Sequence, residues 1–332
     1  MKTNGRRIAM AALLLATAVA AQAQCKFKRV GTIPIEWRDE RLTVDGSING
    51  TPLRMAVDTG EQQTVVSAAL SERLKLAPVH VNNWQVGIGG RSEISMARLD
   101  EFSVGRFQWN HMKVGIVWQS AEIPDVLVGA PLLFGRDVEL TDKAFAFYAA
   151  EGCDEASLGY WADDVPWLPF VPAEHDDPRV YVTVSVNGVP VKALVDTGAP
   201  SSLLDAAVAR RLGFHPEDPA LVVGKMGGIG GHAVPLSAIT FDSVAIGPEI
   251  VRKARIEVAD MWGSAQADRL ALEHGSDSLV ERTHMILGAD FIRSHHLLFA
   301  NSQRRLYFSY LGGDVFQAYK PRPRAAASAP AH

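Results

Sequence analysis

Leu194-Val195-Asp196-Thr197-Gly198-Ala199 is the stretch that decides the predicted fold, and Ala56-Val57-Asp58-Thr59-Gly60 is a near copy of it. In both, an apolar run of strand type ends on Asp-Thr-Gly. An acidic side chain directly after a buried strand is costly unless it is paired or used. The glycine lets the backbone turn sharply and approach a partner closely. One copy is typical of a strand end followed by a turn, whereas two copies in matched surroundings indicate a function.

The surroundings of the two copies match over segments of domain size. Residues 49–58 align with residues 187–196, and both segments begin with Asn-Gly. This dipeptide favours a tight hairpin, because both residues tolerate positive φ. Three more landmarks follow in the same order in each half: a short helical stretch (67–76 and 205–212), a glycine loop (87–90 and 228–231) and an apolar run ending in glycine (125–129 and 285–288). The chain therefore contains an internal repeat of domain size.

Residues 1–24 have the composition of a secretory signal peptide. Basic residues lie within 2–7, residues 8–20 form an apolar core too short to span a bilayer comfortably, and residues 21–23 (Ala-Gln-Ala) fit a small-x-small cleavage site. An uncleaved anchor is the alternative. No other segment has the length and apolarity of a membrane span. We therefore expect an exported protein, periplasmic or secreted, with no stable membrane span after the signal is cleaved.

The charge and the cysteines narrow the range of partners and compartments. The net charge of −4 is small and spread along the chain, which argues against nucleic acid or an anionic membrane surface as the main partner. The two cysteines are Cys25, at the start of the mature chain, and Cys153, just after the first repeat. Export to an oxidising compartment favours a disulfide between them; two unpaired thiols are the alternative.

The mature chain is long enough for two domains of ordinary size. We expect an N-terminal lobe at 25–150, a linker at 151–178, a C-terminal lobe at 179–313 and a disordered tail at 314–332. The linker is rich in proline and lacks periodicity, but its tryptophans and phenylalanine predict that it packs against one lobe. The tail is rich in alanine and proline.

Within each repeat, short apolar or alternating segments are separated by Gly, Asn and Asp, which is typical of mostly antiparallel β domains with little helix. Each repeat is expected to end in a closing strand, at 144–148 and 305–310. The second repeat has more residues between its Asp-Thr-Gly and its apolar run. We expect this extra material at 261–283, a polar stretch of helical character.

These motifs resemble those of a retropepsin-type aspartic protease fused in tandem, in a two-lobed layout similar to that of pepsin. The resemblance covers both repeats and rests on Leu-Val-Asp-Thr-Gly-Ala-Pro-Ser-Ser at 194–202, the glycine loops as flaps, and Ile-Leu-Gly at 286–288. It implies an all-β fold of two tandem retropepsin-like β-barrel lobes with the active site at the lobe interface. It also implies that Asp58 and Asp196 form the catalytic dyad.

The chemistry of peptide hydrolysis explains the need for two such loops. Two carboxylates a few ångströms apart cannot both ionise easily, so they share a proton. The ionised one acts as general base on water and the protonated one donates to the carbonyl, a division for which aspartic proteases are the established example. As the family implies, Thr59 and Thr197 would join the two loops by hydrogen bonds. Gly60 and Gly198 would leave room for substrate and water.

The glycine loops predict a second functional element. An extended substrate can add as a strand and gain affinity from backbone hydrogen bonds. A glycine-rich hairpin with an isoleucine at its tip can close over it and exclude water. Two ordinary glycine turns are the alternative. The expected substrate-binding residues are Gly60, Gly198, Ile88, Gly89, Ile229 and Gly230.

The first half departs from the family pattern at one place. Residues 61–63 (Glu-Gln-Gln) stand where the second half has Ala-Pro-Ser at 199–201. A bulky acid beside the dyad can repel the catalytic charge or alter the loop. If Glu61 points at the dyad, its charge raises the apparent pKa values of the pair and moves the pH optimum towards neutral.

Other chemistries find no support in the sequence. There is no His-Glu-x-x-His, the pair His295-His296 lacks metal-ligand spacing, and Gly224-Lys225 is followed by Met226, which breaks the phosphate-loop pattern. No Gly-x-Ser-x-Gly is present. Two carboxylates also suit a glycosidase, but the paired Asp-Thr-Gly context argues against one. We expect no metal and no cofactor.

The sequence thus predicts an exported aspartic endopeptidase that acts as a monomer on peptide or protein substrates. One alternative is a non-catalytic peptide-binding protein with the same fold, in which Glu61 makes the dyad inactive. Another is a protease whose lobes pair between chains.

Overall fold

The computed structural model describes residues 25–38, 40–118, 123–172, 177–261, 263 and 283–316. The expected signal peptide, nearly all of the expected helical insert (262 and 264–282) and most of the expected tail (317–332) lie outside the described residues. Among the residues described, no helix is long and apolar enough to cross a membrane.

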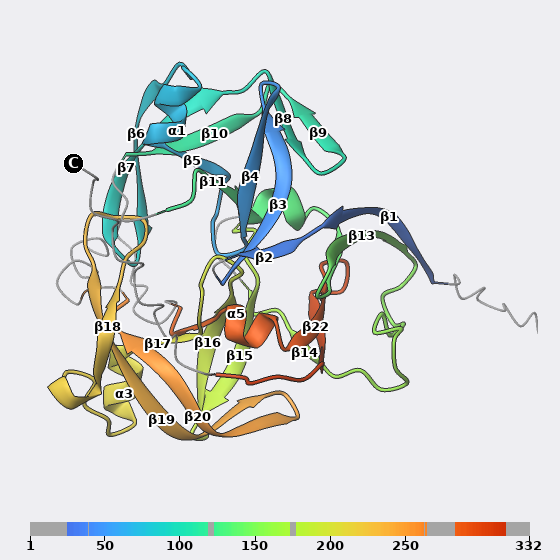
Figure 1. Cartoon of the computed structure of the whole chain (residues 1–332). Coiled ribbons are helices and arrows are strands. Elements are labelled where there is room, and N and C mark those ends of the chain that lie inside the picture. Colours follow the sequence, from blue (N-terminus) through green and yellow to red (C-terminus); the bar gives the residue numbers. More distant parts are fainter. Residues whose placement is uncertain are drawn as a thin grey trace, which may run out of the picture.

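The first lobe is a twisted sheet with two short helices (Figure 1). Its strands are β2 (Glu36–Arg38), β3 (Arg41–Ile48), β4 (Thr51–Asp58), β5 (Val65–Ser67), β6 (Val79–Gly87), β7 (Gly90–Arg98), β8 (Glu101–Val104), β9 (Phe107–Asn110), β10 (Lys113–Val117) and β11 (Val126–Gly129); its helices are α1 (Ala68–Arg73) and α2 (Ala130–Leu133). The strand order is β6-β7-β10-β5-β11-β4-β3-β8-β9, with β2 paired to β3. Most pairs are antiparallel, as predicted, but β5–β10 and β4–β11 are parallel.

The second lobe repeats this plan and closes on itself. Its strands are β15 (Tyr181–Val186), β16 (Val189–Val195), β17 (Leu203–Asp205), β18 (Val222–Met226), β19 (Val234–Ile246), β20 (Glu249–Ala259) and β21 (Met285–Leu287); its helices are α3 (Ala206–Arg211), α5 (Ala289–Ile292) and the 3₁₀ turn η1 (Pro219–Leu221). The order is β15-β16-β21-β17-β20-β19-β18, and a further pairing of β15 with β19 closes a barrel.

The two Asn-Gly sequences form the predicted hairpins. Asn49 and Gly50 have φ of 48° and 78°, and Asn187 and Gly188 have φ of 47° and 81°. Two successive positive φ values belong to the two-residue turn that matches the twist of antiparallel strands. The turns join β3 to β4 and β15 to β16, which are the strands that lead into the two Asp-Thr-Gly sequences.

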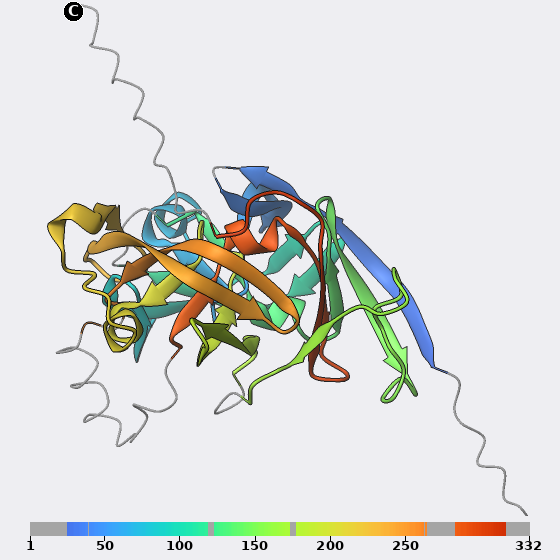
Figure 2. The same cartoon turned by 90° about the horizontal axis from the view of Figure 1, so that it is seen from below.

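A third sheet joins the two halves of the chain, as Figures 1 and 2 show. Its strands are β1 (Lys26–Pro34), β12 (Asp137–Leu140), β13 (Ala144–Glu151), β14 (Trp167–Pro169), β22 (His295–Ala300) and β23 (Arg305–Tyr310), in the order β1-β13-β12-β22-β23-β14. Within this sheet, the strands from the two halves of the chain meet where β12 pairs antiparallel with β22. The two strands expected to close their own lobes, β13 and β23, therefore lie in a sheet that both halves share.

The expected linker packs on this shared sheet. Its strand β14 pairs with β23, and Val165 and Phe170 are buried. Val165 lies in an apolar cluster with Leu298 and Tyr307 of the sheet, whose face would otherwise be exposed to water. The disulfide between Cys25 and Cys153, with a Cα–Cα distance of 4.4 Å, ties the start of β1 to the start of this segment.

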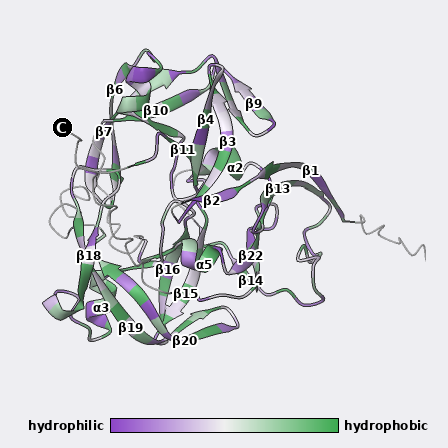
Figure 3. Cartoon of the chain, in the orientation of Figure 1, coloured by the Kyte–Doolittle hydropathy of each residue, from purple (hydrophilic) through white to green (hydrophobic). Residues whose placement is uncertain are grey.

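Burial follows the strand pattern in both lobes. Hydrophobic segments, green in Figure 3, occur along the strands of both lobes. Their buried side chains belong to a large cluster that runs through both lobes and one face of the shared sheet. Phe316, which falls inside the expected tail, is buried near Phe291. The fold is thus all-β with two lobes, as predicted, while the exact domain boundaries stay a prediction.

Candidate active site

Each Asp-Thr-Gly sequence is held in place by the apolar run of its own repeat. Asp58 ends β4 and pairs in parallel with Gly129 at the end of β11. Asp196 follows β16, and its N–H donates to the carbonyl oxygen of Leu287 on β21 at 3.0 Å. A Cβ at Gly129 or Gly288 would lie about 2.5 Å from the backbone of the loop after Asp-Thr-Gly, so both positions need glycine. The runs at 126–129 and 285–288 are therefore core strands behind the loops, as expected.

The two loops are joined by a reciprocal set of threonine hydrogen bonds. The hydroxyl of Thr59 donates to the carbonyl oxygen of Val195 at 2.7 Å and accepts from the N–H of Thr197 at 3.0 Å. The hydroxyl of Thr197 donates to the carbonyl oxygen of Val57 at 2.7 Å and accepts from the N–H of Thr59 at 3.1 Å. Both threonines are fully buried. The lobes are thus joined directly beneath the two aspartates.

The two aspartates lie together at this junction. The N–H of Gly60 donates to Oδ1 of Asp58 at 3.0 Å and to Oδ1 of Asp196 at 3.2 Å, and the N–H of Gly198 donates to Oδ1 of Asp196 at 2.8 Å. A Cβ at Gly60 would lie 2.5 Å from the carboxyl of Asp196, and a Cβ at Gly198 would lie 2.3 Å from that of Asp58. Each glycine therefore makes room for the carboxyl group of the opposite lobe.

The environment favours a shared proton on this pair. Burial raises the pKa of Asp58 well above its usual range, and the negative charges of Asp196 and Glu61 raise it further. Burial also raises the pKa of Asp196, although hydrogen bonds from the N–H of Gly198 and from Asp58 oppose the rise. The pair therefore keeps a proton at a pH at which a lone aspartate would lose it.

Glu61 is a third carboxyl group beside the pair. It is only 5% exposed, and it accepts hydrogen bonds from the N–H of Gln63 and from the side-chain amide of Gln85 on β6. Burial raises the pKa of Glu61 to about 7, against the effect of these two hydrogen bonds and of the positive charge of Arg179. Glu61 therefore points inward, and its negative charge raises the pKa of Asp58.

A cationic group that the sequence alone does not reveal lies at the junction. Arg179 precedes β15, forms an ion pair with Asp177 at 2.7 Å and donates weakly to the carbonyl oxygen of Gly60 at 3.5 Å. The hydroxyl of Tyr181 donates to the same Asp177 carboxylate at 3.0 Å. In the sequence this arginine stands at the end of a proline-rich segment, where charged residues are usually solvated. Only its contact with a loop 119 residues earlier shows its position.

The expected flap loops meet across the lobe interface. The first is the tip of the β6–β7 hairpin, where Gly87 pairs with Gly90, and the second joins β18 to β19. The N–H of Gly89 donates to the carbonyl oxygen of Ile229 at 3.0 Å, and the N–H of His232 donates to that of Gly89 at 3.0 Å. In Figure 1 the two hairpins approach each other on the side of the molecule away from the shared sheet.

The isoleucine at the tip of each loop packs against the opposite lobe. Ile88 packs against an apolar cluster of the second lobe that includes Leu203. Ile229 is buried in a cluster of the first lobe that includes Val65. A Cβ at Gly230 would lie 2.1 Å from the backbone of Gly89, so the tips are in close contact. The expected binding residues Ile88, Gly89, Ile229 and Gly230 are thus brought together.

The histidine pair has structural partners. His295 is buried between the carboxylate of Glu249 and the carbonyl oxygen of Phe291, and His296 contacts the carboxylate of Glu139 at 2.7 Å. Within the described part of the chain, no group of three or more His, Cys, Asp or Glu residues is arranged to hold a metal ion.

Comparisons with known proteins agree with this geometry. The family model described as aspartyl protease matches residues 44–132 and 182–291, so each matched segment contains one Asp-Thr-Gly. No curated protein is significantly similar to the chain in sequence.

Two solved structures are similar to the chain at low sequence identity. The aspartic proteinase from Irpex lacteus has 13% identity and a TM-score of 0.48, with 86% of this chain and 98% of that chain covered. A retropepsin-like aspartic protease from Rickettsia conorii has 14% identity and a TM-score of 0.28, with 39% of this chain and 99% of that chain covered. Because the segments matched by the family model span more than half of the sequence, this chain belongs to the aspartyl protease family.

Proposed function

We propose that this chain is an aspartic endopeptidase that hydrolyses peptide bonds with a water activated between Asp58 and Asp196. The observation that carries the proposal is the single N–H of Gly60, which hydrogen-bonds both carboxyl groups. Such a contact requires the two groups to share one site. Membership of the aspartyl protease family supports the same chemistry.

The surroundings of the pair suggest which carboxyl group holds the proton. Asp196 accepts two backbone N–H groups and lies near the positive charge of Arg179, all of which favour its ionised form. Asp58 faces the charges of Asp196 and Glu61, which favour its protonated form. In this proposal Asp196 takes a proton from the water while Asp58 donates its proton to the substrate carbonyl.

The substrate is a peptide or an unfolded segment of a protein. It would lie extended between the dyad and the two flap loops, where backbone groups on edge strands can pair with it. Because the tips of the loops are hydrogen-bonded to each other, they must separate before a peptide can enter. Gly89 and Gly230, which allow the close contact of the tips, would then face the substrate backbone.

We also propose that residues 1–24 direct export and are removed, and that the mature chain works as a monomer in the periplasm or outside the cell. The Cys25–Cys153 disulfide is compatible with an oxidising compartment. Since one chain contains both aspartates and joins them through Thr59 and Thr197, a second copy is not needed to complete the site.

The test is hydrolysis of an unstructured protein by the purified mature chain between pH 4 and pH 8, with the products identified by mass spectrometry. We expect internal cleavage that a statine-containing transition-state analogue inhibits. The buried third carboxyl group, Glu61, favours one other candidate, a non-catalytic peptide-binding protein. Binding of the unstructured protein without cleavage at any pH in this range would support that candidate and contradict the proposed function.

A further inference from the structure

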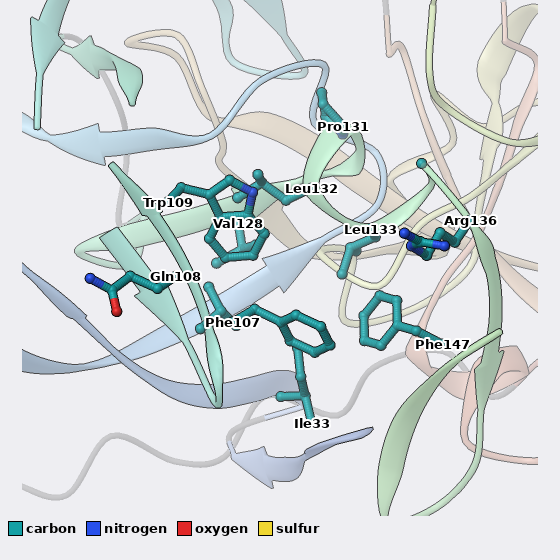
Figure 4. A pocket seen from close by; sticks show the side chains of 12 residues that line it. Ile33, Phe107, Gln108, Trp109, Val128, Pro131, Leu132, Leu133, Arg136 and Phe147 are labelled. Carbon is teal, nitrogen blue, oxygen red and sulfur yellow. The ribbon is translucent and has the colours of Figure 1, made fainter. Parts of the chain in front are cut away.

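The first lobe contains a pocket that the dyad and the flaps do not use. It has a volume of about 380 Å³ and lies between β1, the β8–β9 hairpin, β11 with α2, and β13 (Figure 4). This volume is within the range of small-molecule sites, which is about 300–1,000 Å³. The pocket is therefore large enough for a ligand and not only for one or two water molecules.

The wall of the pocket is apolar and the mouth is polar. The buried wall residues are Ile33, Val104, Val128, Leu133 and Phe147. Phe107 and Trp109 complete the wall with half-buried rings. The exposed polar lining residues are Gln108 and Arg136. Burying an aliphatic group against this wall removes apolar surface from water and is therefore favourable.

Arg136 supplies a positive charge at one end of this apolar space. Figure 4 shows its side chain at the pocket with the guanidinium directed towards Leu133. Within the described part of the chain, the guanidinium makes no ion pair or hydrogen bond. The Gln108 amide, by contrast, already donates to Glu101 at 2.9 Å. Since no described residue occupies the guanidinium, it can offer an anionic group two parallel donors.

We propose that this pocket binds an amphipathic carboxylate, a fatty acid of medium chain length, with its aliphatic chain against Phe107, Val128 and Leu133 and its carboxylate on Arg136. The apolar wall selects the chain and the single cation at the mouth selects a negatively charged head group. A neutral molecule of the same shape would gain the apolar contacts alone. The carboxylate should therefore bind more tightly than a neutral molecule with the same aliphatic chain.

The wall of the pocket is connected through the backbone to the loop that contains Asp58. Val128 directly precedes Gly129, which pairs with Asp58. The N–H of Ala130, at the start of α2, donates to the carbonyl oxygen of Glu61 at 2.9 Å. The proposal itself concerns binding only and does not rest on the proposed protease function.

Tryptophan fluorescence tests the proposal directly, because Trp109 lines the pocket. Undecanoate carrying a terminal bromine would be titrated into the purified mature protein, since bromine quenches a nearby indole. We expect saturable quenching that is lost in Trp109→Phe. Dodecanoate should displace the probe at least tenfold more effectively than dodecanol. Equal displacement by both, or no saturable quenching, would overturn the proposal.

Two variants and a control locate the site. Arg136→Gln should weaken dodecanoate binding about tenfold, the effect of losing one charge-assisted hydrogen bond, while dodecanol binding stays unchanged. Leu132→Trp, at the half-buried edge of the pocket, should block both ligands. Arg106→Gln removes an exposed arginine from the neighbouring β8–β9 turn and should change neither affinity. Equal weakening by Arg106→Gln and Arg136→Gln would show non-specific charge attraction and refute the site. A circular dichroism spectrum of each variant checks that it is folded.

Discussion

Replacing Glu61 by glutamine should make the folded protein more stable at neutral pH but not at acidic pH. The side chain is buried beside the dyad and accepts hydrogen bonds from Gln63 and Gln85. Glutamine keeps the size of the side chain and one acceptor oxygen, and its NH2 group can donate to the Oε1 of Gln85, which is buried without a partner among the described residues. It removes the ionisable group, so the pH dependence of the change in stability reports the burial of the charge.

The size of the effect follows from the pKa of Glu61, which burial raises from 4.5 to about 7. Below pH 4.5 the carboxyl group is protonated in the folded and the unfolded protein and contributes no difference. Between these two pKa values the unfolded chain loses the proton first, so the free energy of unfolding falls as pH rises. Each pKa unit corresponds to 1.36 kcal/mol, which gives a loss of about 3 kcal/mol that is complete above pH 7.

The assay is urea unfolding of wild type and Glu61→Gln at pH 4 and pH 8. The difference in unfolding free energy between the two proteins should grow by about 3 kcal/mol in favour of the variant over this interval. Glu72→Gln is the matched control, because Glu72 is exposed on α1, and its difference should be the same at both pH values. If the difference for Glu61→Gln is also independent of pH, the buried and perturbed state of Glu61 is refuted.

Three further predictions concern the same junction, and a fourth concerns the disulfide. Glu61→Ala should move the alkaline limb of the pH–rate profile of hydrolysis to lower pH, because the negative charge that Glu61 carries at and above neutral pH raises the pKa of Asp58. Profiles that superimpose with wild type would show that Glu61 has no effect on the pair. Thr59→Val removes two buried hydrogen bonds and should lower the free energy of unfolding, measured in urea, by about 2–6 kcal/mol. A loss below about 1 kcal/mol would contradict a stabilising role for the threonine hydrogen bonds between the loops. Gly198→Ala should abolish hydrolysis, since its Cβ would lie 2.3 Å from the Asp58 carboxyl, while Gly224→Ala, which meets no atom within 4 Å, should leave the rate unchanged. The double replacement of Cys25 and Cys153 by serine opens a cross-link with a sequence separation of 128 and should cost about 3–5 kcal/mol; a urea midpoint equal to that of wild type would argue against a stabilising role.

The repeat explains why so much of the site could be predicted from the sequence. The two aspartates stand at matching places in two similar lobes, and the threonine hydrogen bonds between their loops are reciprocal. A pairing of the lobes through these loops therefore brings the carboxyl groups together. The glycine that ends each apolar run and the Asn-Gly hairpins are local signals, and the structure contains them where expected. The catalytic role of Asp58 and Asp196 stays a proposal.

Features that depend on pairing between distant segments could not be predicted. Residues 144–148 and 305–310 are recognisable as strands, but their sequence does not indicate that they join a sheet shared by both halves. Arg179 looks like a solvated charge until its contact with Gly60 is known. The packing of Ile88 and Ile229 against the opposite lobe likewise requires two flaps of particular length and orientation. In each case the position of the segment or side chain depends on tertiary contacts, which local sequence composition does not specify.

The most direct test of a single shared site within one chain compares Asp58→Asn, Asp196→Asn and an equimolar mixture of the two variants. Each single variant should fold as wild type and show no hydrolysis of an unstructured protein, because one carboxyl group cannot supply both the base and the acid. The mixture should also be inactive, since both aspartates of a site come from the same chain. Wild-type activity in either single variant, or activity restored in the mixture, would contradict the account.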